Sequence, residues 1–418
     1  MNLHLQKSEV KNQELKVTIT GSKSETNRLL LLQALYPNLT IDNISNSDDS
    51  KVMIEAIEKL STVNCQLSTE IDVHHAGTAM RFLTAFFAIQ EGKEVVLTGS
   101  SRMKERPIKI LVDALNQLGA EISYEENEGF PPIRIKGKKL TQNKVLLPAN
   151  VSSQYISALL LIAPKLENGL ELTLEGEITS VPYIKMTLAL LNEIGVKTSF
   201  ENNLITVKSS EVEIVSKSIT VESDWSSASY WYSIVALSEI GFQVSLSSYK
   251  KNSLQGDSAL IDLYKDFGVE TTFNSDNSIT ISKTKNCQLS IVNYQLNNCP
   301  DIAQTIAVTC FGLGIASNLT GLHTLKIKET DRLEALKIEL TKLGAEILVT
   351  NDSLHLKSSS GIKQNISVST YQDHRMAMAF APLALKVPIT INQAEVVSKS
   401  YPDFWKDLKK VGFLIEEI

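Results

Sequence analysis

A glycine-marked repeat constrains the fold of this chain more than any other feature of its sequence. Five times a helical stretch reaches an apolar residue and a glycine, and then turns into a strand. The marker glycines are Gly119, Gly195, Gly268, Gly344 and Gly412, which lie 76, 73, 76 and 68 residues apart. Glycine suits this place because a left-handed residue can end a helix and turn the chain. Such junctions also arise by chance in α/β proteins, but five good copies favour a true repeat.

The spacing of the repeat predicts an architecture. A unit of about 70 residues is too long for a solenoid repeat and fits a small βαβαββ block. The closing strand of each full copy is predicted at Ile133–Ile135, Leu204–Val207, Ile279–Ile281 and Leu354–Leu356. A degenerate copy is expected at Ile54–Val73, and the copy that begins near Leu408 is truncated. Six blocks then predict two domains of three blocks each.

Composition narrows the class of protein. The 418 residues exceed one ordinary core, and 43% of them are hydrophobic and 21% charged, as in a globular protein. A net charge of −6 without a basic, aromatic-rich run argues against nucleic-acid binding. No apolar run is long enough for a membrane span, and Met1–Ser8 lacks the core of a signal peptide. The four scattered cysteines form no CxxC pair, so we expect reduced thiols and a cytoplasmic location.

Arginine is used sparingly. Only seven of the 41 basic residues are arginines: Arg28, Arg81, Arg102, Arg106, Arg134, Arg332 and Arg375. Six of the seven lie in the motifs described below. Because the guanidinium group binds carboxylates and phosphates with two parallel hydrogen bonds, this distribution favours anion recognition.

The stretch Gly21–Arg28 has the form of an anion site. It follows a predicted strand at Leu15–Ile19 and precedes an apolar helix predicted over Leu29–Leu35. A glycine turn would deliver Lys23 to a helix N-terminus, where free N–H groups and the helix dipole attract anions. The alternative is an ordinary strand–helix turn that carries solvated cations.

Similar helix starts recur between residues 75 and 183. His75–Leu83 is predicted to begin a helix capped by a threonine, Thr78. Gly99–Pro107 carries two arginines four residues apart, which is typical of a solvated loop or of a mobile clamp over an anion. Ala149–Tyr155 and Ser180–Tyr183 place hydroxyl groups at two more helix starts, and Pro182 suits a first helical position.

The second half adds carboxylates to the pattern. Asp301 is interpreted as a helix N-cap or as a general base. Lys328 and Arg332 would be like charges one helical turn apart, which is unfavourable unless an anion lies between them. Asp373–Met378 is another helix head with an arginine, and Lys399 precedes an aromatic helix. The chain lacks a P-loop, a complete dinucleotide fingerprint, a serine nucleophile elbow and metal-ligand histidine spacings.

Together these motifs resemble those of the enolpyruvyl transferases, and in particular the branch that acts on shikimate 3-phosphate. Ten segments occur in the family order over essentially the whole chain: GSKSETNRLLLLQAL, AGTAMRFL, LTGSSRMKERP, VSSQY, SVPYI, SLQGD, CPDIAQT, KETDRLEAL, DHRMAMA and KSYPDFW. The resemblance implies a two-domain inverse α/β barrel, with three βαβαββ repeats in each domain and the active site in the inter-domain cleft. Residues 1–20 and 223–418 would form one domain and residues 21–222 the other.

The resemblance also implies a reaction and its residues. The enolpyruvyl group of phosphoenolpyruvate would be transferred to the 5-hydroxyl of shikimate 3-phosphate through a tetrahedral intermediate, with release of phosphate. Asp301, Glu329 and Lys23 would transfer protons. Shikimate 3-phosphate would contact Lys23, Ser24, Arg28, Ser152, Ser153, Gln154, Ser180, Asp301 and Lys328. Phosphoenolpyruvate would contact Lys23, Gly77, Arg106, Gln154, Arg332, Arg375 and Lys399. No metal or organic cofactor is implied, and we expect a monomer. The resemblance also implies a glyphosate target, and the sensitivity of this chain stays open because Phe82 departs from the family pattern.

Three positions differ from the family pattern, in which asparagine is usual at the places of His75 and Thr324 and proline at the place of Phe82. Two alternatives stay open. The first is the sister enzyme that acts on a UDP-aminosugar in cell-wall synthesis, although that family usually carries a loop cysteine that Gly99–Pro107 lacks. The second is a non-catalytic binding protein on the same fold, which would be expected to lose Asp301, Glu329 or Lys23.

Overall fold

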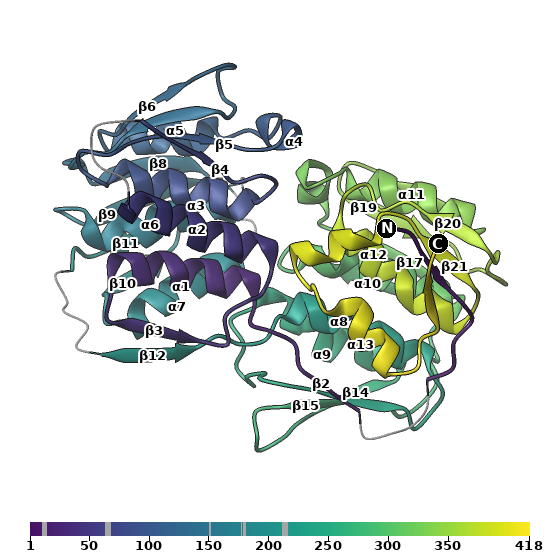
Figure 1. Ribbon diagram of the computed structural model, residues 1–418. Coiled ribbons are helices and arrows are strands. Elements are labelled where there is room, and N and C mark those ends of the chain that lie inside the picture. The colour runs from purple at the N-terminus through teal and green to yellow at the C-terminus, as the bar shows by residue number, and fades with distance from the viewer. Residues whose placement is uncertain (11–14, 63–67, 150–151, 177, 179–180, 211–215) are drawn as a thin grey trace. The chain divides into compact units, whose positions relative to one another are not determined.

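The computed structural model describes the 418 residues except 11–14, 63–67, 150–151, 177, 179–180 and 211–215 (Figure 1). It divides into two compact units of mixed α/β structure. The terminal unit comprises Met1–Gly21 and Glu222–Ile418, and the inserted unit comprises Ser22–Val221. That each unit is a domain able to fold by itself stays a prediction.

Two four-stranded sheets and one strand pair make up the described β-structure of the inserted unit. The first sheet has the order β4 (Thr69–Asp72), β5 (Glu94–Thr98), β7 (Ile133–Lys136), β6 (Glu121–Tyr124). The second has the order β8 (Lys144–Pro148), β9 (Leu170–Glu175), β11 (Leu204–Val207), β10 (Thr198–Glu201). In both sheets the first pair is parallel and the other two pairs are antiparallel. The remaining pair is β3 (Leu39–Asp42) with β12 (Lys217–Thr220), which are parallel.

Buried helices form the centre of the inserted unit. Its helices are α1 (Lys23–Leu35), α2 (Asp48–Thr62), α3 (Gly77–Ala88), α4 (Ser101–Lys104), α5 (Lys109–Gln117), α6 (Ser153–Ile162), the short 3₁₀ helix η1 (Ala163–Lys165) and α7 (Val181–Glu193). Helix α3 is buried along its whole length and contacts α1 and α6, which are themselves mostly buried. A helix that is enclosed on all sides needs mostly small or apolar residues all round, as α3 has apart from Arg81.

Three four-stranded sheets make up the described β-structure of the terminal unit. Their orders are β16 (Ile291–Gln295), β17 (Ala316–Thr320), β19 (Ser353–Leu356), β18 (Ile347–Val349); β2 (Lys16–Val17), β13 (Gln243–Leu246), β15 (Ile279–Lys283), β14 (Val269–Phe273); and β20 (Ile366–Val368), β21 (Ile389–Ile391), β1 (Leu3–Leu5), β22 (Ile415–Glu417). Each sheet repeats the pattern of one parallel pair followed by two antiparallel pairs. The N-terminal strand β1 thereby completes the sheet that holds the C-terminal strand.

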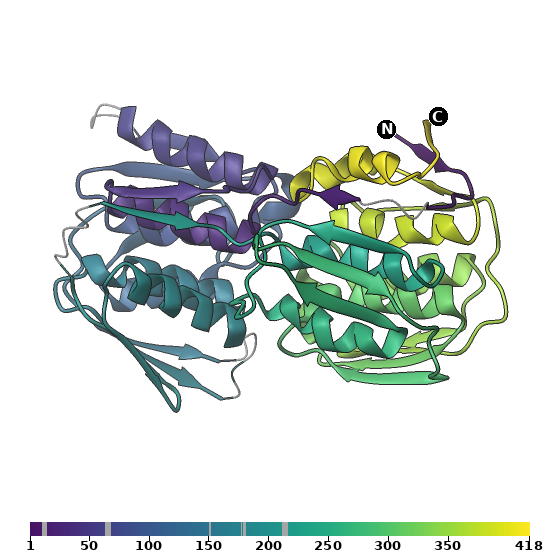
Figure 2. The same ribbon diagram turned by 90° about the horizontal axis from the view of Figure 1, so that it is seen from below.

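The helices of the terminal unit are α8 (Trp225–Leu237), η2 (Gly256–Ala259), α9 (Leu260–Leu263), η3 (Tyr264–Phe267), η4 (Pro300–Ile302), α10 (Ala303–Leu313), η5 (His323–Ile327), α11 (Arg332–Lys342), α12 (His374–Phe380), η6 (Ala381–Leu385), η7 (Ala394–Lys399) and α13 (Phe404–Lys410). Helices α8, α10 and α12 are almost wholly buried and contact one another. In Figure 2 helices and strands of this unit lie in layers. The heads of these inner helices carry the polar residues of the candidate site.

The glycine-marked repeat is confirmed. All five marker glycines follow a helix and have positive φ angles, between 77° and 108°. The four predicted closing strands are β7, β11, β15 and β19. The degenerate copy at Ile54–Val73 consists of the end of α2 and the strand β4, with residues 63–67 outside the described chain.

The strand expected at Leu15–Ile19 is shorter in the structure and comprises only β2. The apolar helix expected over Leu29–Leu35 is the second half of α1, which begins at Lys23, where the glycine turn predicted a helix N-terminus. In the described parts of the chain no helix combines the length and the apolar character needed to cross a bilayer.

Candidate active site

The inserted unit places Lys23 at the start of α1, as predicted. Its Nζ lies 3.4 Å from Oδ2 of Asp49, a buried residue of α2, and His75 Nε2 lies 4.0 Å from the other oxygen of that carboxylate. Sequence reasoning missed Asp49, since it stands outside every motif. The non-family residue His75 therefore adjoins the ion pair that holds Lys23.

Arg28 is buried, so the interpretation of a solvated cation is wrong for this residue. Its guanidinium donates to Thr187 Oγ1 (2.8 Å), Ser157 Oγ (2.9 Å) and the carbonyl oxygen of Ser24 (2.7 Å). Burial lowers its pKa to about 10. The ring of Phe82 lies 5.4 Å from the guanidinium carbon, so the non-family residue at position 82 supports the cation. Arg28 thus ties α1 to α6 and α7, and its contact with shikimate 3-phosphate stays a prediction.

The head of α3 differs from the prediction in its cap. Ala76 is the N-cap, and Thr78 lies inside the first turn, so the predicted threonine cap is wrong. The Thr78 hydroxyl instead accepts a hydrogen bond from Gln154 Nε2 at 3.1 Å. Ser152 does cap α6, because its hydroxyl accepts from the Gln154 backbone N–H. Ser153 is buried in the first turn of α6, and Ser180 lies outside the described residues.

Arg106 lies against the first residue of α3. A Cβ atom built on Gly77 would come within 2.6 Å of Arg106 Nη1, so only glycine leaves room for this guanidinium. The Arg106 Nε is buried and, among the described residues, has no hydrogen-bond acceptor. The next carbonyl, of Pro107, accepts from Arg81 Nη2 (3.1 Å) and from the hydroxyl of Tyr155 (2.6 Å). The end of the segment Gly99–Pro107 is therefore anchored, and Arg106 has a donor without a partner in the described part of the protein.

In the terminal unit, Arg332 joins three carboxylates. It is 2% exposed, and its Nε, Nη1 and Nη2 lie 2.6, 2.8 and 2.8 Å from Asp373, Asp301 and Glu329. These carboxylates raise the pKa of Arg332 above its ordinary value, although burial acts against them. The two carboxylates predicted to transfer protons are thus fixed by one guanidinium at the head of α11.

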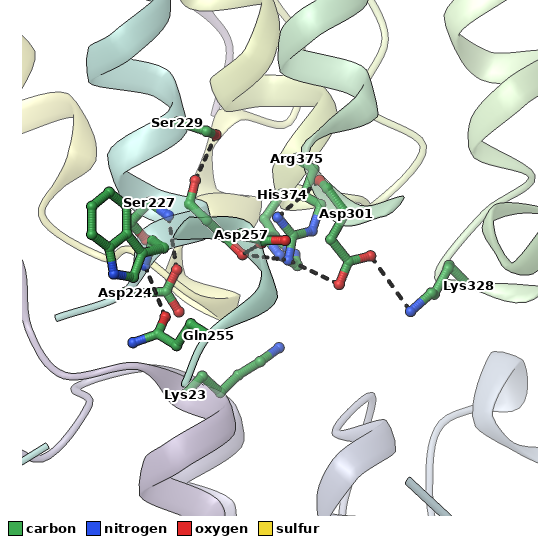
Figure 3. A network of polar contacts seen from close by, with 12 residues as sticks. Lys23, Asp224, Ser227, Ser229, Gln255, Asp257, Asp301, Lys328, His374 and Arg375 are labelled. Atoms are coloured by element: carbon green, nitrogen blue, oxygen red, sulfur yellow. Dashed lines mark hydrogen bonds and ion pairs between the residues drawn. The ribbon is translucent and has the colours of Figure 1, made fainter. Parts of the chain in front are cut away.

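Asp301 lies in η4 and caps no helix, so the N-cap interpretation is wrong. Its carboxylate receives Lys328 Nζ at 3.5 Å, Arg332 Nη1 at 2.8 Å and Arg375 Nη2 at 3.4 Å (Figure 3 shows Lys328 and Arg375). Burial raises the pKa of Asp301, but Lys328, Arg375 and Arg332 together hold it well below its usual range. The anion expected between Lys328 and Arg332 is therefore this carboxylate, and Lys328 lies outside α11.

The N-terminus of α12 carries Arg375, as predicted, and is capped by Asp373. Asp373 accepts from the Arg375 backbone N–H at 2.8 Å, while Arg375 Nη1 donates to the Asp301 carbonyl oxygen at 3.2 Å. The Arg375 Nε is buried without an acceptor in the described chain, as in Arg106. Lys399 donates to the Gln372 carbonyl oxygen at 2.7 Å, which brings the last predicted lysine to the same loop.

The predicted residues of the terminal unit therefore gather at one place: Asp301, Lys328, Glu329, Arg332 and Arg375 form a continuous network, and Lys399 reaches the loop before α12. The described predicted residues of the inserted unit lie in the first two turns of α1 and at the heads of α3 and α6, with Arg106 against the head of α3. Sequence reasoning assigned no role to Asp257, although its motif SLQGD was recognised. Among described residues, no group of three or more His, Cys, Asp or Glu side chains is arranged to hold a metal ion.

The fold is that of the enolpyruvyl transferases. The enolpyruvyl transferase NikO from Streptomyces tendae matches with a TM-score of 0.73 over 99% of this chain and 98% of its own, at 13% identity. EPSP synthase from Acinetobacter baumannii matches with a TM-score of 0.78 over 99% of both chains, at 21% identity. At such identities the likeness shows the fold alone.

Sequence comparison identifies the family. The pattern of the family described as EPSP synthase (3-phosphoshikimate 1-carboxyvinyltransferase) matches residues 7–408. A protein named 3-phosphoshikimate 1-carboxyvinyltransferase from Bacteroides fragilis (strain YCH46) is 45% identical, over 96% of this chain and 97% of its own. One of the same name from Haemophilus influenzae (strain PittEE) is 36% identical, over 94% and 96%. The chain belongs to the EPSP synthase family, and it is a transferase.

Proposed function

We propose that this chain transfers the enolpyruvyl group of phosphoenolpyruvate to the 5-hydroxyl of shikimate 3-phosphate and releases phosphate, a step of aromatic amino acid biosynthesis. The family and the names of the relatives support the acceptor and the transferred group. One structural observation carries the assignment of the site: Asp301 and Glu329 share one buried guanidinium, with Lys328 and Arg375 beside them.

The reaction needs proton transfer in both directions. The oxygen of the 5-hydroxyl bonds to the central carbon of phosphoenolpyruvate and loses its proton, while the methylene carbon gains one. In the second half the methyl group of this tetrahedral intermediate gives up a proton, and the bond to phosphate breaks. Asp301, Glu329 and Lys23 are the proposed proton-transfer groups.

The cations around Asp301 couple substrate binding to its basicity. Lys328 and Arg375 lower the pKa of this carboxyl in the free enzyme. An anionic substrate that pairs with the same cations offsets their field, so the pKa of Asp301 rises toward the range in which a carboxylate accepts protons efficiently.

Each substrate is assigned residues from both units. Shikimate 3-phosphate is assigned to Lys23, Ser24, Arg28, Ser152, Ser153, Gln154, Ser180, Asp301 and Lys328. Phosphoenolpyruvate is assigned to Lys23, Gly77, Arg106, Gln154, Arg332, Arg375 and Lys399. Support comes from the buried Nε–H donors of Arg106 and Arg375, which have no acceptor among the residues that the structure describes, because a buried donor without an acceptor is costly unless a ligand satisfies it.

The finer architecture is part of the proposal. We infer that each unit is an inverse α/β barrel of three βαβαββ repeats and that the active site lies in the cleft between them. The three described sheets around buried helices in each unit support the barrel. We also expect a monomer that acts in the cytoplasm and keeps full activity after treatment with EDTA.

The test is a phosphate-release assay with purified protein. Phosphate should appear with phosphoenolpyruvate plus shikimate 3-phosphate, and it should not appear when UDP-N-acetylglucosamine replaces the acceptor. Phosphate release that occurs with UDP-N-acetylglucosamine as the acceptor, and not with shikimate 3-phosphate, would assign the chain to the cell-wall reaction. Release with neither acceptor, in protein that binds both ligands by calorimetry, would favour a binding protein.

A further inference from the structure

A buried acid outside the proposed machinery lies next to it. Asp257, in η2, is 2% exposed, and Figure 3 shows it in a row with Arg375, Asp301 and Lys328. Its Oδ2 accepts a short hydrogen bond from the hydroxyl of Ser226, in the first turn of α8. Its Oδ1 is buried and has no hydrogen-bond partner among the described residues.

The hydroxyl of Ser226 links this acid to Arg375. Arg375 Nη2 lies 3.2 Å from Ser226 Oγ, which accepts its N–H. A hydroxyl can donate only one hydrogen bond, and Ser226 donates its bond to Asp257. A lone pair of the Ser226 oxygen therefore faces the guanidinium. The result is a chain of two hydrogen bonds that runs in one direction, from Arg375 through Ser226 to Asp257.

This pair of hydrogen bonds adds a second contact to Arg375 beside the contact with Asp301. Asp301 binds the guanidinium directly, through its carboxylate and its carbonyl oxygen. With that contact alone, the group could turn toward Asp301 and take its free Nε–H with it. The Ser226 hydroxyl gives Nη2 a second partner and holds the plane of the guanidinium in place.

We propose that Asp257, acting through Ser226, is a positioning residue for Arg375 in the binding of phosphoenolpyruvate. This inference rests on the proposed function, because that function gives Arg375 its ligand. Without the Asp257 carboxylate, the Ser226 proton is free to point at Arg375, and Nη2 loses Ser226 as an acceptor and keeps only the longer contact with the Asp301 carboxylate.

The ionisation of Asp257 supplies a signature. Burial, and then the charge of Asp301, raise the pKa of Asp257 to about 7. The groups that face it are Asp301 and Cys299 from the η4 segment, Asp224 from the cap of α8, and Arg375 from α12. Below pH 7 the protonated acid is a poorer acceptor for Ser226, so kcat/KM for phosphoenolpyruvate should fall as the pH falls through about 7.

The test is initial-rate kinetics on the full chain with Asp257→Asn, Ser226→Ala and the double variant. Each single variant should raise KM for phosphoenolpyruvate about tenfold, the effect of one hydrogen bond to a charged group. KM for shikimate 3-phosphate should change less than about twofold. The double variant should raise KM for phosphoenolpyruvate no more than the more affected single variant does, because both substitutions break the same series of hydrogen bonds. Ser233→Ala is the matched control. Ser233 is a buried serine of α8 that accepts a hydrogen bond from Thr309, and its replacement should leave KM for phosphoenolpyruvate unchanged.

The pH profile separates positioning from a general loss of structure. The break near pH 7 should disappear in Asp257→Asn, while the ionisation of the substrate phosphate, near pH 6, persists in every variant. An unchanged KM for phosphoenolpyruvate in Ser226→Ala, or an equal rise of both KM values, would overturn the inference while wild-type turnover upholds the proposed function. A wild-type chain without turnover would instead overturn the proposed function, and the inference with it.

Discussion

Arg332 has three carboxylate partners, and this number decides how the site responds to a change at one of them. Removing one carboxylate leaves two on the guanidinium, so its charge remains compensated. Removing the arginine would leave all three carboxylates with a lost partner. A buried charge without its partner costs about 3–5 kcal/mol, so the carboxylates are the safer targets for mutation.

Asp301→Asn should therefore keep the fold and lose the reaction. We expect kcat to fall by about 10²–10⁴, the usual contribution of a general acid or base. The phosphate-release assay measures the rate, and far-UV circular dichroism checks the fold. Glu329→Gln is the companion variant on the same guanidinium. A wild-type rate in either variant would remove that residue from proton transfer.

Gly77→Ala should interfere with Arg106. The added Cβ would lie 2.6 Å from Nη1 and 2.8 Å from Nη2, so the guanidinium must move away from the head of α3. We expect KM for phosphoenolpyruvate to rise at least about tenfold, as for a lost hydrogen bond to a charged group, with KM for shikimate 3-phosphate unchanged. Gly361→Ala, where an added Cβ meets no atom within 4 Å, is the control. Unchanged kinetics in Gly77→Ala would show that Arg106 does not need its place against α3.

At the scale of elements, the marker glycines perform one task in different surroundings. Each turns a helix into the next strand with a positive φ angle, which costs a non-glycine residue about 1–2 kcal/mol. The room for a side chain at the marker glycine differs from copy to copy. An added Cβ at Gly344 would meet only Lys363 side-chain atoms at 3.6 Å or more, whereas at Gly268 it would lie 1.9 Å from the Lys285 carbonyl oxygen.

Gly268→Ala should therefore destabilise the terminal unit more than Gly344→Ala does. The second variant should lose about 1–2 kcal/mol of unfolding free energy from the backbone alone. The first adds the displacement of the Lys285 backbone, so its loss should be larger. Urea unfolding followed by tryptophan fluorescence measures both, since all three tryptophans lie in this unit. Equal losses of unfolding free energy in the two variants would mean that the Lys285 backbone can move away from the added Cβ at no energetic cost.

At the scale of the whole molecule, the inserted unit is one continuous segment whose two ends meet. β3, near its start, pairs in parallel with β12, near its end, and Val221 donates its N–H to the Asp42 carbonyl oxygen. The terminal unit is closed in a corresponding way, because Gly21 and Ser223 form an antiparallel bridge. At both places where the chain passes from one unit to the other, each unit therefore holds its two chain segments together by its own hydrogen bonds. This is the usual condition for an inserted segment that folds by itself.

Residues 22–221 expressed alone should fold. We expect a cooperative thermal transition and native-like circular dichroism, because the strands of this unit pair only with each other in the described structure. The fragment should show no turnover, since Asp301 and Glu329 belong to the terminal unit. A broad, non-cooperative transition would contradict the assignment of this segment as a domain.

The sequence by itself determined the repeat, its closing strands and the helix heads, because glycine stereochemistry, hydrophobic periodicity and capping act within about ten residues of chain. It also singled out the arginines Arg28, Arg106, Arg332 and Arg375. Only the tertiary structure decided their partners. Asp301 resembles a cap locally, yet its carboxylate binds Lys328, which follows η5, and arginines from α11 and α12. The partners of Asp49 and Asp257 come from other segments of the chain. The local sequence around each carboxylate does not predict which of these groups will be buried next to it.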